Sequence, residues 1–207
     1  TGGCGPCRFG YYSEMEKEIL KGIGYEMDII ALEKPDKGLG ELIKRIKHLT
    51  GGFNVLKITN AVKNAAQISI QVDELERLTY KIRPREINKG STDKLYKTFR
   101  SEVLRTEGSS AIKKLIADYK NKLLSIHVDK DAVPMKIGIV GEIYTTIDSY
   151  TSFNLDIKLG NMGIEVSRAV TVSEWIVDHM IKKALHLPRD TRYIDAAKPY
   201  LGTMIGG

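Results

Sequence analysis

Two stretches in the last third of the chain decide its fold: residues 134–141 read PMKIGIVG, and residues 163–170 read GIEVSRAV. Each is a short apolar run bounded by glycine or proline, a pattern typical of a strand buried in a parallel sheet. A helical pattern over residues 152–162 separates the two predicted strands, and another begins at Thr171 or Ser173. This strand–helix–strand–helix order predicts an α/β fold with a parallel sheet and a right-handed crossover.

The candidate site follows from that sheet. In parallel sheets, ligands bind beyond the carboxyl ends of the strands. The first strand leads into Gly141, Glu142 and a predicted polar loop over residues 144–151, with Asn154 shortly after. Glu142 is a candidate acid, base or holder of a polar substrate group, with a helix or loop cap as the alternative. Gly141 and Asn154 are candidate cofactor-binding residues.

The sequence pattern in the middle of the chain indicates only helices, and these form an insert between the amino-terminal and carboxy-terminal α/β segments. The three expected helices cover residues 54–82, 92–106 and 110–125. In the first, Asn54 is a candidate cap, and Leu75, Leu78 and Ile82 fall on one apolar stripe at three- and four-residue spacing. Pro84 ends the run, because proline lacks the N–H that a helix interior needs.

The amino-terminal part mixes helix and strand patterns. A helix is expected over residues 6–22, a strand over 25–32 and a helix over 41–49. We therefore divide the chain into three parts: an α/β segment (residues 1–53), a helical insert (54–130) and a βαβα segment (131–207).

Composition limits the function classes. The 207 residues carry a net charge of +6 with 26 acidic residues interspersed, and no dense basic run stands out. This pattern favours a solvated helical surface over nucleic-acid binding. No apolar run approaches the roughly 20 residues that cross a membrane. Only two cysteines are present, which indicates a reducing compartment.

Both cysteines lie in one motif, Cys4-Gly5-Pro6-Cys7. Thioredoxin-like redox chemistry is one interpretation, although that motif needs a strand before it and only Thr1-Gly2-Gly3 precedes this one. The second interpretation is half of a zinc or iron–sulfur site, because two cysteines at this spacing can hold one metal ion. A pair of small buried residues is the third.

Three strings carry a resemblance to a known family. They are GCGPCRFGYY at residues 3–12, IGIVGEIY at 137–144 with Asn154 downstream, and GIEV at 163–166 followed by Trp175. These strings resemble the 2-hydroxyacyl-CoA dehydratase-like family, which includes proteins related to the activator of 2-hydroxyglutaryl-CoA dehydratase. The resemblance spans nearly the whole chain, but its specific motifs lie towards the two ends.

The resemblance implies a cytoplasmic protein with Rossmann-like α/β lobes and an iron–sulfur cluster held by cysteines from different lobes. It also implies an ATP-hydrolysing iron–sulfur activator as partner, separate or fused, that delivers one low-potential electron. In true dehydratases the electron passes to a 2-hydroxyacyl-CoA thioester. Other relatives use it on other substrates.

Only Cys4 and Cys7 match cluster ligands of the family, and Arg8 is a candidate for balancing thiolate or cluster charge, with a surface arginine as the alternative. At least one further family cysteine would lie beyond Gly207, so we expect a fragment with an incomplete ligand set that is inactive alone. The chain lacks the phosphate motifs of the ATPase lobe, and we expect no ATPase activity from it.

Two hypotheses from other classes stay open. One is a thiol–disulfide oxidoreductase that uses Cys4 and Cys7. The other is a non-catalytic α/β interaction module whose basic helices dock an acidic partner, with an affinity that falls as salt rises.

Overall fold

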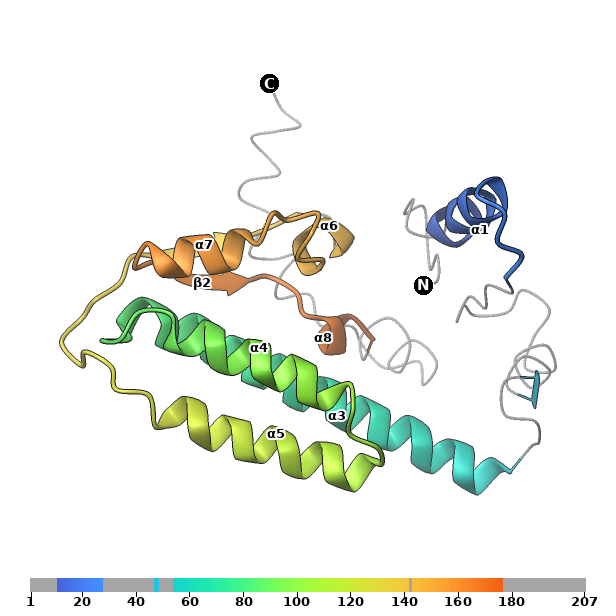
Figure 1. Ribbon diagram of the computed structural model, residues 1–207, viewed down its shortest axis with the longest axis horizontal. Coiled ribbons are helices and arrows are strands. Elements are labelled where there is room, and N and C mark those ends of the chain that lie inside the picture. Colours follow the sequence, from blue (N-terminus) through green and yellow to red (C-terminus); the bar gives the residue numbers. More distant parts are fainter. Residues whose placement is uncertain (1–10, 28–46, 49–53, 142, 177–207) are drawn as a thin grey trace, which may run out of the picture. The chain divides into compact units, whose positions relative to one another are not determined.

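The computed structural model describes residues 11–27, 47–48, 54–141 and 143–176. Its elements are α1 (Tyr12–Gly22), α3 (Val55–Ile82), the short 3-10 helix η2 (Arg83–Arg85), α4 (Ser91–Val103), α5 (Ser109–Leu124), β1 (Lys136–Ile139), α6 (Ile143–Ile147), α7 (Leu155–Asn161), β2 (Glu165–Arg168) and α8 (Val172–Ile176), as shown in Figure 1. The chain divides into two compact units, residues 1–61 and 62–207, and each is described by itself.

In the first unit, α1 ends at Gly22 as the sequence predicts, and Gly24 adopts a φ of +88°, which favours glycine. Residues 25–27, the beginning of the expected strand 25–32, are not in a strand. The remainder of that strand, residues 6–10 of the expected first helix and most of the expected helix 41–49 lie outside the described residues. Helix α3 begins in this unit, where the Asn54 side-chain oxygen accepts the Lys57 N–H at 3.0 Å and confirms the predicted cap.

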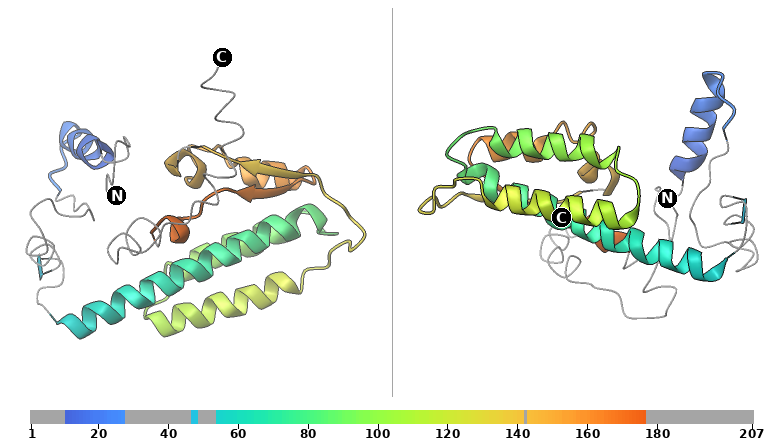
Figure 2. Two further views of the ribbon diagram at one scale, coloured as in Figure 1. Left: turned by 180° about the vertical axis from the view of Figure 1, so that it is seen from behind. Right: turned by 60° about the horizontal axis from the view of Figure 1, so that its bottom comes forward.

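The second unit has a core made by three helices. Helices α3, α4 and α5 lie side by side in Figures 1 and 2. The buried side chains that join them are Leu75, Ile82, Phe99, Ile116, Tyr119 and Leu123. The Phe99 and Tyr119 rings lie 5.4 Å apart between their centroids. The stripe expected on α3 therefore does face the core, with Leu78 packed against the cluster.

A buried carboxylate begins α4. Glu86 is 2% exposed and accepts the N–H of Gly90 at 2.6 Å, the N–H of Thr92 at 2.8 Å and the Thr92 hydroxyl at 2.6 Å. Gly90, the residue before the helix, has a φ of +87° and no side chain that could cap it. Glu86 thus supplies both the hydrogen-bond acceptors and the negative charge that a helix amino terminus favours.

The η2 segment is held from two sides. The Arg83 side chain is 2% exposed, and its Nε donates to Asp93 Oδ1 at 2.7 Å. A Cβ added at Gly160 in α7 would lie 2.6 Å from Arg83 Cδ, so the close packing of α7 on η2 requires glycine there. The backbone beyond α5 returns to this segment, since the Asp129 N–H donates to the Arg85 carbonyl at 2.8 Å.

The expected parallel pair of strands is present. Strands β1 and β2 run parallel, with Lys136 opposite Glu165 and Ile139 opposite Arg168. The described chain is mostly helical with this small sheet, which makes it a mixed α/β fold. Helices α6 and α7 connect the two strands.

Among the described residues, none of the helices combines the length and the apolar composition of a membrane-spanning segment.

The expected loop over residues 144–151 is wrong in part, because it contains most of α6. The helix expected over 152–162 is confirmed, although it covers only Leu155–Asn161. The burial expected for the first strand is wrong. Exposed and half-buried residues alternate along β1, and Val140 beyond it is 75% exposed. A continuous apolar run indicates two covered faces, whereas this alternation indicates that only one face of β1 is covered.

Candidate functional site

A cavity of about 200 Å³ lies at the carboxyl ends of β1 and β2. Its lining comes from both strand ends and from the α6–α7 connection, and comprises Ile139, Val140, Gly141, Thr145, Thr146, Ser152, Leu155, Asp156 and Arg168. This is the end of a parallel sheet at which ligands bind in α/β proteins.

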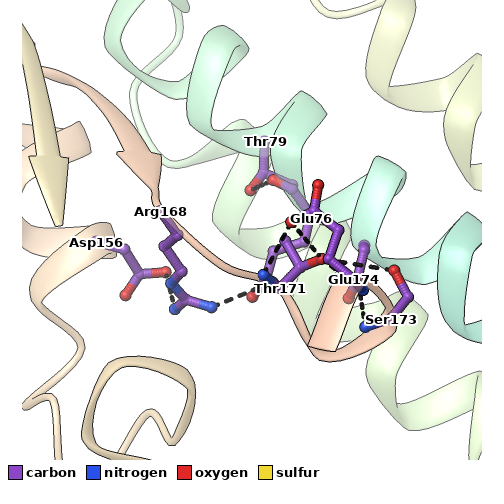
Figure 3. Close-up of polar contacts among 8 residues, drawn as sticks. Glu76, Thr79, Asp156, Arg168, Thr171, Ser173 and Glu174 are labelled. Carbon is purple, nitrogen blue, oxygen red and sulfur yellow. Dashed lines mark hydrogen bonds and ion pairs between the residues drawn. The ribbon is translucent and has the colours of Figure 1, made fainter. Parts of the chain in front are cut away.

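Arg168 is the central charged group of the site. It is the last residue of β2, and its side chain is 5% exposed. Its guanidinium lies between two carboxylates, with Nη1 at 3.2 Å from Glu76 Oε2 and Nη2 at 3.2 Å from Asp156 Oδ2. Figure 3 shows the arginine reaching Asp156 on one side and Glu76 on the other. The guanidinium carbon also lies 5.4 Å from the centre of the Tyr80 ring, a cation–π distance.

Several polar atoms in and beside this cluster have no hydrogen-bond partner within the described part of the chain. Among the cavity residues, they are Arg168 Nε, Asp156 Oδ1 and Ser152 Oγ, all of them buried. Buried polar atoms are normally satisfied by protein or by water, so water or a bound ligand can supply the missing partners of these cavity-lining residues. A donor on Arg168 and an acceptor on Asp156 suit a ligand group that both accepts and donates, such as a hydroxyl.

Burial shifts the titration of this cluster. The pKa of Glu76 is raised above its ordinary value, chiefly because burial disfavours the charged carboxylate. Arg168 opposes the shift, and the nearby Asp156 and Asp73 carboxylates add to it. The Tyr80 hydroxyl lies near Glu76 without forming a hydrogen bond to it, and burial raises the pKa of this phenol as well. The carboxyl groups of Glu76, Asp156 and Asp73 thus lie around the guanidinium of Arg168, and this surplus of acidic groups does not suit an anionic ligand.

The polar face of α3 positions β2 and α8. Asp73 Oδ2 accepts the N–H of Ser173 at 2.8 Å, and Arg77 Nη2 donates to Glu174 Oε1 at 2.6 Å. Together with Glu76 and Tyr80, these residues recur at three- and four-residue spacing, so they share one face of the helix. That face contacts the segment that leaves the sheet, and Figure 3 shows Glu76 of α3 together with Arg168 at the end of β2.

Helix α8 begins at a reciprocal cap. The Thr171 hydroxyl accepts the Glu174 N–H at 3.4 Å, and Glu174 Oε2 accepts the Thr171 N–H at 3.1 Å. This is the capping box that a Thr-x-x-Glu sequence favours, and it confirms Thr171 as a start of the expected last helix. The part of that helix beyond Ile176 lies outside the described residues.

The residues chosen from the sequence are placed as follows. Gly141 lines the cavity. Asn154 precedes α7 in a left-handed conformation, is exposed and does not line the cavity. Glu142 lies outside the described residues, as do Arg8 and the two cysteines, Cys4 and Cys7.

Sequence reasoning missed the charged residues of the site. Arg168 carries a local signal, because an arginine at the end of an apolar strand stands at the edge where ligands bind. Asp156 and Ser152 carry no such signal. Glu76 belongs to a polar face of α3 that reads as an ordinary solvated surface.

No group of three or more His, Cys, Asp or Glu side chains in the described part of the chain is arranged to hold a metal ion. That finding does not extend to Cys4 and Cys7.

The raised pKa of Glu76 predicts a pH-dependent stability. For a carboxyl group whose folded pKa lies above its ordinary value of 4.5, protonation favours the folded state, so stability falls as pH rises from about 4.5 through the folded pKa. The variant Glu76→Gln lacks this titration and should lose less stability than the parent over that range. Urea unfolding of both proteins at a series of pH values would measure the difference. Parallel pH profiles would contradict the prediction.

Comparisons with protein-family models, curated proteins and solved structures give no match for this chain. The family assignment therefore remains a proposal that rests on the sequence motifs.

Proposed function

We propose that this chain is part of a cytoplasmic iron–sulfur protein related to 2-hydroxyacyl-CoA dehydratases and their activators. In this proposal its parallel sheet belongs to a Rossmann-like lobe. The protein takes part in ATP-driven, low-potential electron transfer to a CoA thioester or a similar substrate. The observation that carries the proposal is the pair Cys4 and Cys7 in the string GCGPCRFGYY, which leads into α1.

Cys4 and Cys7 are the proposed thiolate ligands of the cluster, and Arg8 balances their negative charge. When bound, the cluster would supply one-electron chemistry at low potential. Because the chain has only these two cysteines, further ligands come from outside it, and an ATP-hydrolysing iron–sulfur activator is the proposed partner.

The cavity beyond β1 and β2 supports a substrate role for the sheet. Its volume of about 200 Å³ is below the range for whole drug-sized ligands, so it suits the acyl end of a thioester rather than the whole molecule. Arg168 Nε can donate to a carbonyl or hydroxyl oxygen, and Asp156 Oδ1 can accept from a hydroxyl. Gly141, at the cavity, and Asn154, outside it, are the proposed cofactor-binding residues. Glu142, on the same connection, is the proposed acid, base or holder of a polar substrate group.

Iron binding tests the proposal. This chain and the full natural polypeptide that contains it would be reconstituted anaerobically with iron and sulfide, beside Cys4→Ser and Cys7→Ser variants. We expect bound iron, bound sulfide and visible absorption in at least the full polypeptide, and their loss in both variants. Lys17→Ser, on the exposed face of α1, is the matched control and should bind as the parent does.

The absence of iron from the full polypeptide would overturn the proposal, as would iron that survives both serine variants. An insulin-reduction assay then tests the redox alternative. Turnover that requires Cys4 would indicate a thiol–disulfide oxidoreductase.

A further inference from the structure

A second cavity, of about 480 Å³, lies on one face of α4. Residues 93, 97, 100 and 104 recur at four-, three- and four-residue spacing, which places them along that face. Arg83 from η2 and Ile157 from α7 complete the lining together with Tyr96 and Ser101. We call this cavity the α4 groove. It shares no lining residue with the cavity at the strand ends.

The α4 groove carries an excess of positive charge. Arg83, Lys97 and Arg100 line it, and Asp93 is its single carboxylate. Asp93 is fully engaged, with Oδ1 accepting from Arg83 Nε at 2.7 Å and Oδ2 from the Asn161 amide at 3.0 Å. Lys97 and Arg100 are exposed, and neither makes an ion pair with the described residues. Within the described part of the chain, the charges of Lys97 and Arg100 are thus not balanced by an ion pair.

The innermost residue of the groove has an unmet hydrogen bond. Arg83 is 98% buried, since its exposed fraction is 2%, and its Nη1 has no hydrogen-bond partner among the described residues. An arginine N–H that is taken out of water without an acceptor is unfavourable, and carboxylate and phosphate oxygens are the acceptors that guanidinium groups match best. A ligand oxygen at the base of the groove would provide the acceptor that the described part of the chain does not.

The remaining lining is apolar or aromatic. Leu104 is 87% exposed and Ile157 is half-buried. Tyr96, which also lines the groove, stands between Asp93 and Lys97 in the sequence. The volume falls within the range of small-molecule sites, which combine apolar walls with a few polar groups. Size, charge and lining together distinguish the groove from a flat basic surface.

We propose that the α4 groove binds a small organic anion, with its phosphate or carboxylate group held by Lys97, Arg100 and Arg83 and its apolar body against Leu104 and Ile157. This site is independent of the cysteine pair and of the substrate cavity.

Titration of the full chain with phenyl phosphate and phenylacetate, followed by calorimetry or by amide chemical shifts, tests the proposal. We expect saturable binding of at least one of the two compounds. The compound that binds more tightly identifies the head group, phosphate or carboxylate, that the groove prefers. Inorganic phosphate and benzyl alcohol, which each lack one half of the ligand, should bind at least about tenfold more weakly.

Variants locate the binding. Lys97→Gln and Arg100→Gln should each weaken binding by about tenfold, since each removes one charge-assisted contact. Both side chains are exposed, so the variants are expected to fold, as circular dichroism would verify. Lys94→Gln, an exposed lysine of α4 outside the groove, is the matched control and should bind as the parent does.

The proposal is overturned if neither phenyl compound binds, or if Lys94→Gln weakens binding as much as Lys97→Gln. The second result would indicate a general attraction of anions to a basic surface. Because Cys4→Ser and Cys7→Ser leave the groove intact, failure of cluster binding and failure of anion binding are separate results.

Discussion

Replacement of Arg168 by methionine should lower the free energy of unfolding by about 3–5 kcal/mol. The substitution keeps much of the apolar stem but removes the one guanidinium that lies between Glu76 and Asp156. The Asp156 side chain is 8% exposed and that of Glu76 is 25% exposed, so two carboxylates would be left poorly hydrated and close to each other. Urea unfolding followed by circular dichroism measures the loss.

Arg77→Met is the matched control for this prediction. Arg77 pairs with Glu174 at 2.6 Å, a shorter distance than either Arg168 contact, but both side chains are 47% exposed. Exposed pairs contribute at most about 1 kcal/mol, so burial and not distance should decide the result. Combining Arg168→Met with Glu76→Gln and Asp156→Asn should restore much of the stability. Equal losses in the two arginine variants would refute our account of the cluster.

Replacement of Glu86 by alanine should lower the free energy of unfolding by about 3 kcal/mol, because it leaves three donors at the start of α4 without an acceptor. It also removes a negative charge from the helix amino terminus. Glu86→Gln should lose less, since one side-chain oxygen remains to accept. Hydrogen exchange adds a local measurement, because the amides of Gly90 and Thr92 should exchange faster.

Glu107→Gln controls for the loss of a carboxylate on an exposed residue and should leave stability within about 0.5 kcal/mol of the parent. If Glu86→Ala lost no more than this control, Glu86 would not be the residue that caps α4.

Local pattern was sufficient to predict the helices of the second unit. The expected helix 54–82 and the observed Val55–Ile82 agree because three apolar residues, a cap and a proline all act within the segment itself. Local pattern also predicts the two strands as a parallel pair, although β1 is less buried than its apolar residues indicate. Burial depends on which elements cover a strand, and that information lies elsewhere in the chain.

For the candidate site, too, local sequence patterns predict some residues and miss those whose role depends on distant parts of the chain. Gly141 was predicted to lie at the cavity because it directly follows a strand. The Arg168 cluster was not predicted, because it joins a strand end, a short helix and the polar face of α3, and periodicity gives no information on such pairings. The charges were visible in the sequence, but their burial was not.

The contacts between α3 and the β2–α8 segment join residues far apart in the chain, 92 positions for Arg168 and Glu76 and 100 for Ser173 and Asp73. We expect contacts that close such long loops to form late in folding, after the local helices and their core, because loop closure costs chain entropy before the contacts stabilise it. Interactions absent from the transition state act mainly on the rate of unfolding. The charged cluster should therefore determine how long the second unit stays folded, with little influence on how fast it folds.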